Sequence, residues 1–493
     1  MPVDPTSYRP DPRYLDLGVE GFADPVAPAD FPERVLRFRN QRWAERVGLG
    51  ALSPGEWLEH FARFAPLPHN LPEPLALRYH GHQFQAYNPQ IGDGRGFLYA
   101  QLREPAVGGG PGRLLDLGTK GSGRTPHSRD GDGRLTLKGA VREILATEML
   151  EALGVPTSKT FSVIETGEKL QRHDEPSPTR SAVLVRLSWS HIRFGTFQRH
   201  AFEKRTDRIG ALVEHCLATY YPEVDVGDDA PLALFRALRP RMAELGARWM
   251  AAGFVHGVLN TDNMCVTGES FDYGPWRFLP RFDPTFTAAY FDQGGLYAYG
   301  RQIQTLGWNL ARLAEALHPA SPSAPWQETL EAFQGEAERA LARAFLGRFG
   351  LEEADPETNA STTGAIFGFL TARRELPFQQ LFHDWYGGEL SAARAAESPY
   401  AALYEGRDYQ AFRDALAKHT PKASVAATLA SLPFQRARPV DVLIGEVEEL
   451  WSRIDEVDDW SPLEWKVEDI RRLGAALRQP SGHTWPSSHV VDS

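Results

Sequence analysis

The amino-acid sequence predicts an α+β protein with two lobes, in which a strand-rich first half precedes a helical second half. The first observation is that short apolar stretches at 97–102, 114–119, 159–166 and 182–187 have the pattern of strands. The second is that the apolar spacing from about residue 206 onward is mainly that of helices. Because ligands commonly bind in clefts between lobes, we expect the functional site where the two halves meet.

One amphipathic helix interrupts the predicted strands. Its apolar positions from Leu137 to Met149 recur at helical spacing, and Gly154 ahead of Pro156 is expected to end it. In the second half, a loop region at 254–274 interrupts the helical pattern.

Composition limits the class of partner. Acidic residues outnumber basic ones by 64 to 53 among 493, which argues against a nucleic-acid or membrane-surface partner. No stretch reaches the roughly 20 apolar residues of a membrane span, and the first 18 residues do not resemble a signal peptide. Two cysteines cannot form a disulfide framework. We expect a cytoplasmic protein with no nucleic-acid and no membrane partner.

Two features of the strand-rich half are typical of phosphate binding. Gly92 and Gly94 precede a strand and let backbone amides approach a phosphate closely, while Arg95 adds charge. Lys120 ends the next strand, and Glu143 lies on the following helix, as in the pair that holds nucleotide phosphates in protein kinases. Each feature alone also fits a plain structure: a hairpin turn, a surface lysine and a solvated glutamate.

A basic run surrounds these features. Between Arg113 and Arg142 there are seven Lys or Arg and three Asp, interleaved with glycines and including Asp132-Gly133. We expect a concentrated positive field there, which Arg186 and Arg193 would extend. A buried arginine needs a partner, which here could be a phosphate or a carboxylate.

The most specific motif lies in the loop region. His256 to Asn263 is followed by Asp272 in a DYG triplet, and kinases use the corresponding Asn and Asp to hold a metal. Hard oxygen ligands of this kind suit Mg²⁺ or Mn²⁺. Val258 occupies the position of the kinase catalytic Asp, and Asp262 is the only carboxylate in the loop that could replace it. The order of these residues predicts a protein-kinase-like fold with a strand-rich N-lobe and a helical C-lobe.

The predicted organisation has five parts. Residues 1–75 form an N-terminal wrapping segment with no site of its own, and 76–205 form the nucleotide-binding N-lobe. Residues 206–330 form the C-lobe with the catalytic and metal loops, and 331–479 form a helical C-terminal extension. Residues 480–493, rich in Pro, Ser and His, are expected to be a flexible tail.

Several longer motifs point to one family. They are Gly81-His82-Gln83-Phe84, Lys120-Gly121, Thr125-Pro126, Ser128-Arg129, Gly131-Asp132-Gly133-Arg134, Arg142-Glu143, Arg193-Phe194-Gly195, and His256-Gly257 through Asn263-Met264. With these motifs, residues 76–318 resemble the selenoprotein O family of protein adenylyltransferases. The resemblance implies transfer of AMP from ATP, or of UMP from UTP, to Ser, Thr or Tyr hydroxyls of proteins and of the enzyme itself. Pyrophosphate is released, and Mg²⁺ or Mn²⁺ is the expected cofactor.

The resemblance also implies a role for each candidate residue. Asp262 would be the proton acceptor, Asn263 and Asp272 would hold the metal, and Lys120 and Glu143 would be the ion pair; nucleotide contacts would come from Gly92, Gly94, Arg95, Lys120, Asp132, Gly133, Arg186, Arg193 and Asp272.

Three other functions stay open at this point. One is a conventional phosphotransferase with Asp262 as base, and another is a catalytically silent nucleotide-binding pseudokinase that serves as a scaffold. The third is a metallohydrolase built on His80, His82 and Asp93.

Overall fold

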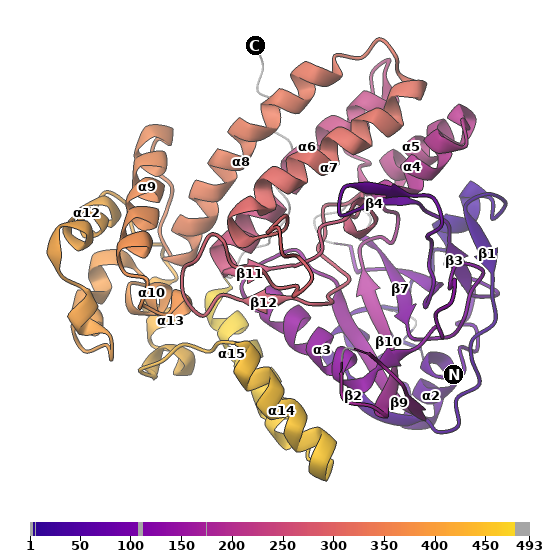
Figure 1. The fold of residues 1–493 in the computed structure, drawn as a ribbon, viewed down its shortest axis with the longest axis horizontal. Coiled ribbons are helices and arrows are strands. Elements are labelled where there is room, and N and C mark those ends of the chain that lie inside the picture. Colours follow the sequence, from indigo (N-terminus) through magenta and orange to yellow (C-terminus); the bar gives the residue numbers. More distant parts are fainter. Residues whose placement is uncertain (1–2, 5, 107–111, 174, 479–493) are drawn as a thin grey trace.

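The computed structural model describes residues 3–4, 6–106, 112–173 and 175–478 (Figure 1). It is an α+β protein with an antiparallel sheet in its N-terminal region and helices in its C-terminal region, so the predicted fold class is confirmed at that level. The predicted tail at 480–493 lies outside the described residues.

The sheet has eight strands. Its order is β1-β3-β6-β7-β10-β9-β2, and β8 pairs with β10 beside this path. All neighbouring strands are antiparallel. The strands are β1 (Ala23–Pro25), β2 (Val35–Arg39), β3 (Leu75–Leu77), β6 (Leu98–Arg103), β7 (Leu114–Lys120), β8 (Leu135–Thr136), β9 (Lys159–Leu170) and β10 (Thr179–Ser188).

Two small two-stranded sheets lie outside this sheet. The first is a hairpin of β4 (Gly81–Gln83) and β5 (Ala86–Asn88), and the second pairs β11 (Phe254–Val255) with β12 (Arg277–Phe278). The β11–β12 pair brackets the loop region that the sequence places in the middle of the helical half.

The first 75 residues contribute more than the sequence predicts. They supply β1 and β2, which form the two opposite edges of the sheet. Strands of three and five residues are too short for an alternating pattern to stand out, and β2 is at most half-buried. The predicted strands at 97–102, 114–119, 159–166 and 182–187 correspond to β6, β7, β9 and β10.

Helix α3 (Leu137–Ala152) packs against β9 and β10. The Thr136 hydroxyl accepts a hydrogen bond from the Gly139 amide at 3.1 Å and so caps the first turn. Gly154 has φ +77°, a left-handed conformation that glycine adopts without strain and that ends helices. The predicted helix and its glycine stop are confirmed.

Helices dominate from residue 194 onward. Figure 1 shows α6, α7 and α8 side by side, with α9 to α12 beyond them and α15 against α3. Including α1 and α2 near the N-terminus, the helices other than α3 are α1 (Gln41–Arg46), α2 (Pro54–Phe61), α4 (Phe194–Phe202), α5 (Thr206–Tyr220), α6 (Ala230–Ala252), α7 (Gln302–Leu317), α8 (Trp326–Arg348), α9 (Pro356–Ala372), α10 (Phe378–Asp384), α11 (Ala392–Ala396), α12 (Gly406–Leu416), α13 (Val425–Leu429), α14 (Ile444–Val457) and α15 (Ser461–Leu477).

Apolar side chains form two cores. The larger joins the sheet to α3, α5, α6, α7 and α15, so the two halves of the chain share one interior. The smaller lies among α8, α9, α10 and α12. In the described part of the chain, no helix combines the length and the apolarity that crossing a membrane needs.

The C-terminal helix α15 is fastened to α3 by a buried ion pair. Glu148 of α3 is 3% exposed and accepts hydrogen bonds from Arg471 at 2.6 and 2.9 Å. At Gly474 a β-carbon would lie only 3.0 Å from the Ala152 backbone, so the two helices touch closely. The last helix among the described residues thus holds α3, the first helix after Lys120.

Replacing Arg471 tests this attachment. Because Arg471→Ala leaves the buried Glu148 carboxylate without its main partner, we expect the free energy of unfolding to fall by about 2 kcal/mol. Arg472→Ala is the matched control, because Arg472 and its partner Glu468 are about half exposed and should contribute nothing measurable. Urea unfolding followed by circular dichroism measures both, and equal losses would contradict the proposed attachment.

Candidate nucleotide site

Four charged side chains meet between the sheet, α3 and the loop after residue 270. Lys120 Nζ lies 2.7 Å from Glu143 Oε2 and 2.9 Å from Asp272 Oδ1. Arg186 Nη2 lies 3.3 Å from the same Asp272 oxygen. Arg186 stands opposite Gly118, two residues before Lys120, so both cations emerge on one face of the sheet. Antiparallel register and one helix therefore assemble this charged cluster.

Asp272 contacts both cations of the charged cluster, Lys120 and Arg186. Its backbone has φ +63°, which a residue other than glycine seldom adopts and which is typical of functional sites. Burial alone would raise the pKa of the Asp272 carboxyl, but Lys120, Arg186, Arg193 and Arg95 outweigh it and hold that pKa well below its usual value. The carboxylate is therefore ionised, and its side chain stays 24% exposed toward solvent.

Arg193 forms a second centre close by. Its guanidinium is 5% exposed; Nη1 donates to the Asp262 carbonyl at 2.8 Å and Nη2 lies 3.1 Å from Asp93 Oδ1. It also lies over the rings of Tyr79 and Phe271, at 4.3 and 4.9 Å from their centroids. Arg193 thereby connects the loop of residue 93 to the loop that carries Asp262.

Asp262 lies in a short 3₁₀ helix, Thr261–Asn263. Its carboxylate is buried, and burial raises the pKa to about 6. Gln83 Nε2 donates to Oδ2 at 3.4 Å, while Oδ1 has no hydrogen-bond partner among the described residues. A β-carbon on Gly81 would lie 2.6 Å from Oδ1, so only glycine lets strand β4 approach this closely. One carboxylate oxygen is thus hydrogen-bonded, and the other is buried without a hydrogen-bond partner among the described residues.

The loop around Asp262 is tied to its neighbours. Asn263 Nδ2 donates to the Val258 carbonyl at 3.0 Å, which leaves the Asn263 side-chain oxygen as an acceptor. The buried His256 ring lies 3.0 Å from the Phe271 carbonyl, directly before Asp272. The two loops that the sequence singles out are therefore joined by one buried histidine.

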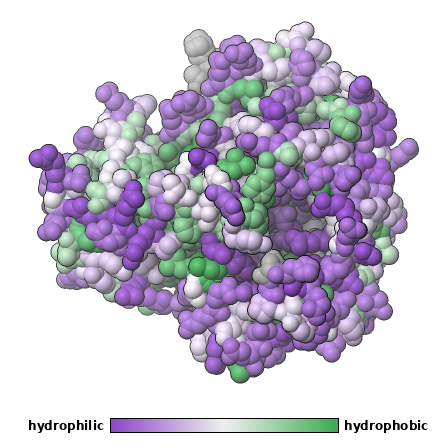
Figure 2. All heavy atoms as spheres, in the orientation of Figure 1, coloured by the Kyte–Doolittle hydropathy of each residue, from purple (hydrophilic) through white to green (hydrophobic). Residues whose placement is uncertain are grey.

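Several buried donors in this region lack a protein acceptor. Arg186 Nε and Nη1 and Arg193 Nε have no hydrogen-bond partner within the described ranges. Unmade hydrogen bonds of buried cations are costly, and phosphate oxygens are the acceptors that arginine matches best. Figure 2 shows a hollow lined by hydrophilic side chains on this face, over the area where Figure 1 places β7 and β10 beside β4. The hollow and the open donors suit an anionic ligand.

The glycine-rich segments pack against each other. A β-carbon on Gly92 would lie 2.6 Å from the His127 ring, and one on Gly133 would lie 2.3 Å from Gly123. A β-carbon on Gly94 would likewise lie 2.9 Å from the His127 carbonyl. These glycines are thus explained by close backbone contact within the protein. The Arg95 side chain is exposed, and its charge acts on Asp272.

Asp132 stands apart from the charged cluster. It pairs with Arg172 at 2.8 Å, and its side chain is 47% exposed. No contact between the described residues links Asp132 or Gly133 to Lys120 or Asp272. The structure thus brings Lys120, Glu143, Arg186 and Asp272 together and leaves Asp132 at the rim.

The expected positive field along Arg113 to Arg142 is partly neutralised, which corrects the prediction of an open field. Carboxylates pair with four of its seven cations: Arg113 with Glu104, Lys120 with Glu143, Arg134 with Glu168, and Lys138 with Glu448. The sequence shows the sign of each charge but not a distant partner such as Glu448. Arg186 and Arg193, which were expected to extend the field, are buried and lie beside Asp272 and Asp93.

The alternative metal site at His80, His82 and Asp93 is not formed among the described residues. His80 Nδ1 lies 2.8 Å from the Tyr87 hydroxyl, and Gln198 Nε2 lies 2.9 Å from His82 Nδ1. Asp93 pairs with Arg193. In the parts of the chain that the structure describes, no group of three His, Cys, Asp or Glu side chains is arranged to hold a metal ion. Each of the three residues has a structural partner.

Three residues at the site had no role assigned from the sequence: Gln83, Tyr79 and Phe271. Gln83 lies in a family motif but approaches Asp262 only through the fold. The two aromatic rings are recognisable only by their contact with Arg193. Asp93, which lies between Gly92 and Gly94 in the sequence, pairs with Arg193 and so joins the site in a role other than that of a metal ligand.

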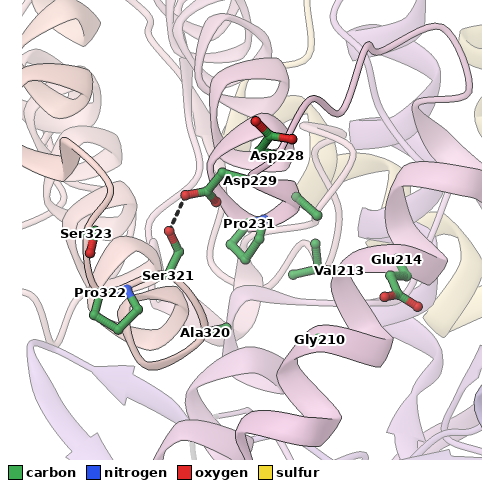
Figure 3. A pocket seen from close by; sticks show the side chains of 11 residues that line it. Gly210, Val213, Glu214, Asp228, Asp229, Pro231, Ala320, Ser321, Pro322 and Ser323 are labelled. Carbon is green, nitrogen blue, oxygen red and sulfur yellow. Dashed lines mark hydrogen bonds between the residues drawn. The ribbon is translucent and has the colours of Figure 1, made fainter.

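A separate cavity of about 430 Å³ lies between α5, the start of α6 and residues 320–323 (Figure 3). Its lining includes the carboxylates of Glu214, Asp228 and Asp229, and the Ser321 hydroxyl donates to Asp229. It contains none of the predicted site residues. The repulsion that these carboxylates would exert on phosphate makes the charged cluster the better nucleotide site.

Comparison with known proteins gives a consistent result. The family described as protein adenylyltransferase SelO matches residues 6–471. Protein nucleotidyltransferase YdiU of Synechocystis sp. (strain ATCC 27184 / PCC 6803 / Kazusa) is 43% identical over 480 residues, which cover 94% of this chain and 97% of that protein. The proteins of the same name from Synechococcus elongatus and Trichodesmium erythraeum are 43% and 42% identical, each over 92% of this chain and over 93% and 97% of their own lengths.

Replacing Glu143 tests the charged cluster. Glu143→Gln keeps the shape but removes the charge that faces buried Lys120, so we expect the free energy of unfolding to fall by about 2 kcal/mol. Glu448→Gln is the matched control, because Glu448 also pairs with a lysine of α3 but its side chain is 46% exposed. Urea unfolding of both variants measures the difference, and a Glu143→Gln protein as stable as the control would contradict the cluster.

Proposed function

The chain belongs to the SelO family of protein adenylyltransferases and is a protein nucleotidyltransferase, and from that premise we propose that it transfers AMP from ATP to Ser, Thr or Tyr hydroxyls of proteins, itself included. The observation that carries the proposal is the set of buried arginine donors, at Arg186 and Arg193, that have no acceptor among the described residues. The phosphate oxygens of a nucleoside triphosphate would supply such acceptors. UTP, which carries the same phosphates, is the alternative donor.

The proposed reaction has one bond-making and one bond-breaking event. The acceptor hydroxyl oxygen attacks the α-phosphorus of ATP, and the bond from that phosphorus to the oxygen bridging to the β-phosphate breaks. AMP remains on the protein acceptor and pyrophosphate leaves with the bond electrons. Lys120, Arg186 and Arg193 neutralise the charge on the phosphates and so stabilise the leaving group. The hydroxyl proton goes to Asp262.

Asp262 is the proposed proton acceptor because of its geometry. Its Oδ1 is buried and free, and its Oδ2 accepts from Gln83. Val258, at the position where kinases have their catalytic Asp, offers only its carbonyl, which accepts from Asn263. With Asp262 as base, the acceptor hydroxyl would approach from the side of strand β4. The base would then lie four residues after the position at which kinases have their catalytic Asp, which supports transfer of AMP over transfer of the γ-phosphate.

Asn263 and Asp272 are the residues proposed to hold Mg²⁺ or Mn²⁺. The Asn263 side-chain oxygen is free because Nδ2 is engaged, and the Asp272 carboxylate is kept ionised. Two hard oxygen donors fit these cations, which take their other ligands from phosphates and water. When bound, such a metal would neutralise phosphate charge. The protein's own task is to hold these two oxygen donors beside Lys120 and Arg186.

We infer further that the strand-rich and helical regions are the lobes of a protein-kinase-like fold. The support is the order Lys120, Glu143, Asn263 and Asp272 along the chain, together with contacts that gather Lys120, Glu143 and Asp272. The two cysteines, Cys216 and Cys265, are free and buried, which is in keeping with a cytoplasmic location.

Labelled ATP tests the proposed reaction. With Mg²⁺ or Mn²⁺ and a protein acceptor, we expect label from the α-phosphate, and not from the γ-phosphate, to enter protein. Asp262→Asn should lower the rate by about a hundredfold or more, because it removes the proton acceptor. Asp132→Asn is the comparison variant: a weaker apparent ATP affinity with an unchanged maximal rate would place Asp132 in nucleotide binding.

The other outcomes are equally clear. Transfer of the γ-label would identify a phosphotransferase, and ATP binding without transfer of either label would identify a scaffold. Chelation of divalent ions with EDTA should stop transfer, and activity that persists in EDTA would contradict the roles of Asn263 and Asp272.

Gly81→Ala tests the position of Asp262 without changing any catalytic group. The added methyl group would lie 2.6 Å from Asp262 Oδ1 and must displace the carboxylate. We expect the AMP transfer rate to fall by about a hundredfold while ATP affinity and stability stay close to wild type. Gly55→Ala is the control, because a β-carbon there meets nothing within 4 Å. Full activity of Gly81→Ala would show that Asp262 need not occupy its observed position.

A further inference from the structure

We propose that three exposed aromatic residues, Phe84, Tyr290 and Phe291, form the docking surface for the protein segment that carries the acceptor hydroxyl. This surface, the aromatic patch, would recognise an apolar side chain and acidic residues close to that hydroxyl. The proposal rests on the proposed function, because it names the acceptor class of the same site.

The aromatic patch is contiguous and open. Tyr290 is 78% exposed, Phe291 48% and Phe84 37%. The Phe291 ring centroid lies 5.1 Å from that of Tyr290 and 5.7 Å from that of Phe84. Beneath them, buried Tyr297 packs against Phe84 at 4.9 Å. Clustered exposed aromatic residues are costly in water and are enriched where proteins bind partners.

The patch lies next to the proposed proton acceptor. Gln83, which donates to Asp262, directly precedes Phe84 in the β4–β5 hairpin. The Asn260 side-chain oxygen accepts from the Phe84 amide at 3.0 Å and from the Tyr297 hydroxyl at 2.8 Å. The Asn260 side chain, two residues before Asp262, therefore binds both Phe84 of the patch and Tyr297 beneath it. A segment bound on the patch would bring a nearby hydroxyl toward Asp262.

The hairpin keeps Phe84 exposed at a conformational cost. Phe84 and Gln85 have φ +48° and +65°, left-handed values that cost free energy in residues other than glycine. The Phe84 amide donates to the Asn260 side chain in this conformation. The ring is thus presented to solvent by a turn that the surrounding contacts enforce.

The charge in the loop that follows the patch favours an acidic segment. Arg301 is exposed, and its Nη1 donates to the Gly294 and Gly295 carbonyls, three and four residues after Phe291. Asp292 is 5% exposed and accepts from two backbone amides. The exposed charge between Phe291 and Arg301 is therefore positive, which selects against basic acceptors.

Binding of fluorescent peptides to the full-length protein tests the patch. The probes are short peptides with one Tyr, flanked either by Leu and Asp or by Gly and Lys. We expect the Leu–Asp peptide to bind more tightly, and the double variant Tyr290→Ser, Phe291→Ser to weaken it by at least about tenfold. ATP affinity should not change. Trp465→Ser is the matched control, because it also removes an exposed aromatic ring but outside the patch. Trp465 is 70% exposed and lies on α15, which packs against α3.

A charge exchange gives a second, independent measurement. Arg301→Glu should reduce the preference for the acidic peptide several-fold, because Arg301 is exposed and its Nη1 donates to carbonyls of the loop that follows Phe291. Peptide binding equal to wild type in the double variant would overturn the proposal. A wild-type dimer that the double variant dissociates, or peptide binding that appears only after deletion of residues 479–493, would also overturn it by assigning the patch to another occupant.

The binding measurement separates this inference from the proposed function. If the peptide binds through the patch but no AMP is transferred to it, the proposed function fails and the docking surface stands. If AMP is transferred equally well by wild type and by the double variant, the docking surface fails and the proposed function stands.

Discussion

The contact that the rest of the site depends on is the one between Lys120 and Asp272. Four charged groups with little exposure meet there. Burying them costs free energy, and the cost is offset only if each group stays in contact with a group of opposite charge. This requirement fixes the end of β7, the face of α3 and the loop of residue 272 relative to one another. The left-handed backbone of Asp272 is a conformational cost that these contacts offset.

The same constraint explains why the C-terminal helix lies where it does. Glu143 and Glu148 are five residues apart on α3, so one faces Lys120 and the other faces Arg471 of α15. A helix held on opposite sides by two buried ion pairs has little freedom to move away from the sheet. The position of Glu143 in the site is therefore linked to a helix more than three hundred residues later in the chain.

The sequence predicts local elements and local spacing well and long-range partners poorly. The four strands and α3 could be read from periodicity and from Gly154, because those signals lie within each segment. Edge strands β1 and β2 could not, because their short segments gain stability only from pairing with distant strands. For the same reason the basic run looked like an open positive field, although its partners, such as Glu448, lie far away in sequence. The motifs picked out Lys120 and Asp272, but the pairing of Arg193 with Asp93 needed the fold.

Residue 258 carries no carboxylate, and the contacts around it show which way the nearest carboxylate of the loop points. The Val258 carbonyl orients Asn263, and the nearest carboxylate in the loop, Asp262, points toward strand β4 through Gln83. With Asp262 as the proposed proton acceptor, an acceptor hydroxyl would approach along the β4–β5 hairpin. Since that hairpin also presents Phe84, the proposed proton acceptor and the proposed docking surface would both be positioned by one element. A change in the hairpin should alter which proteins are modified before it alters how the nucleotide is held.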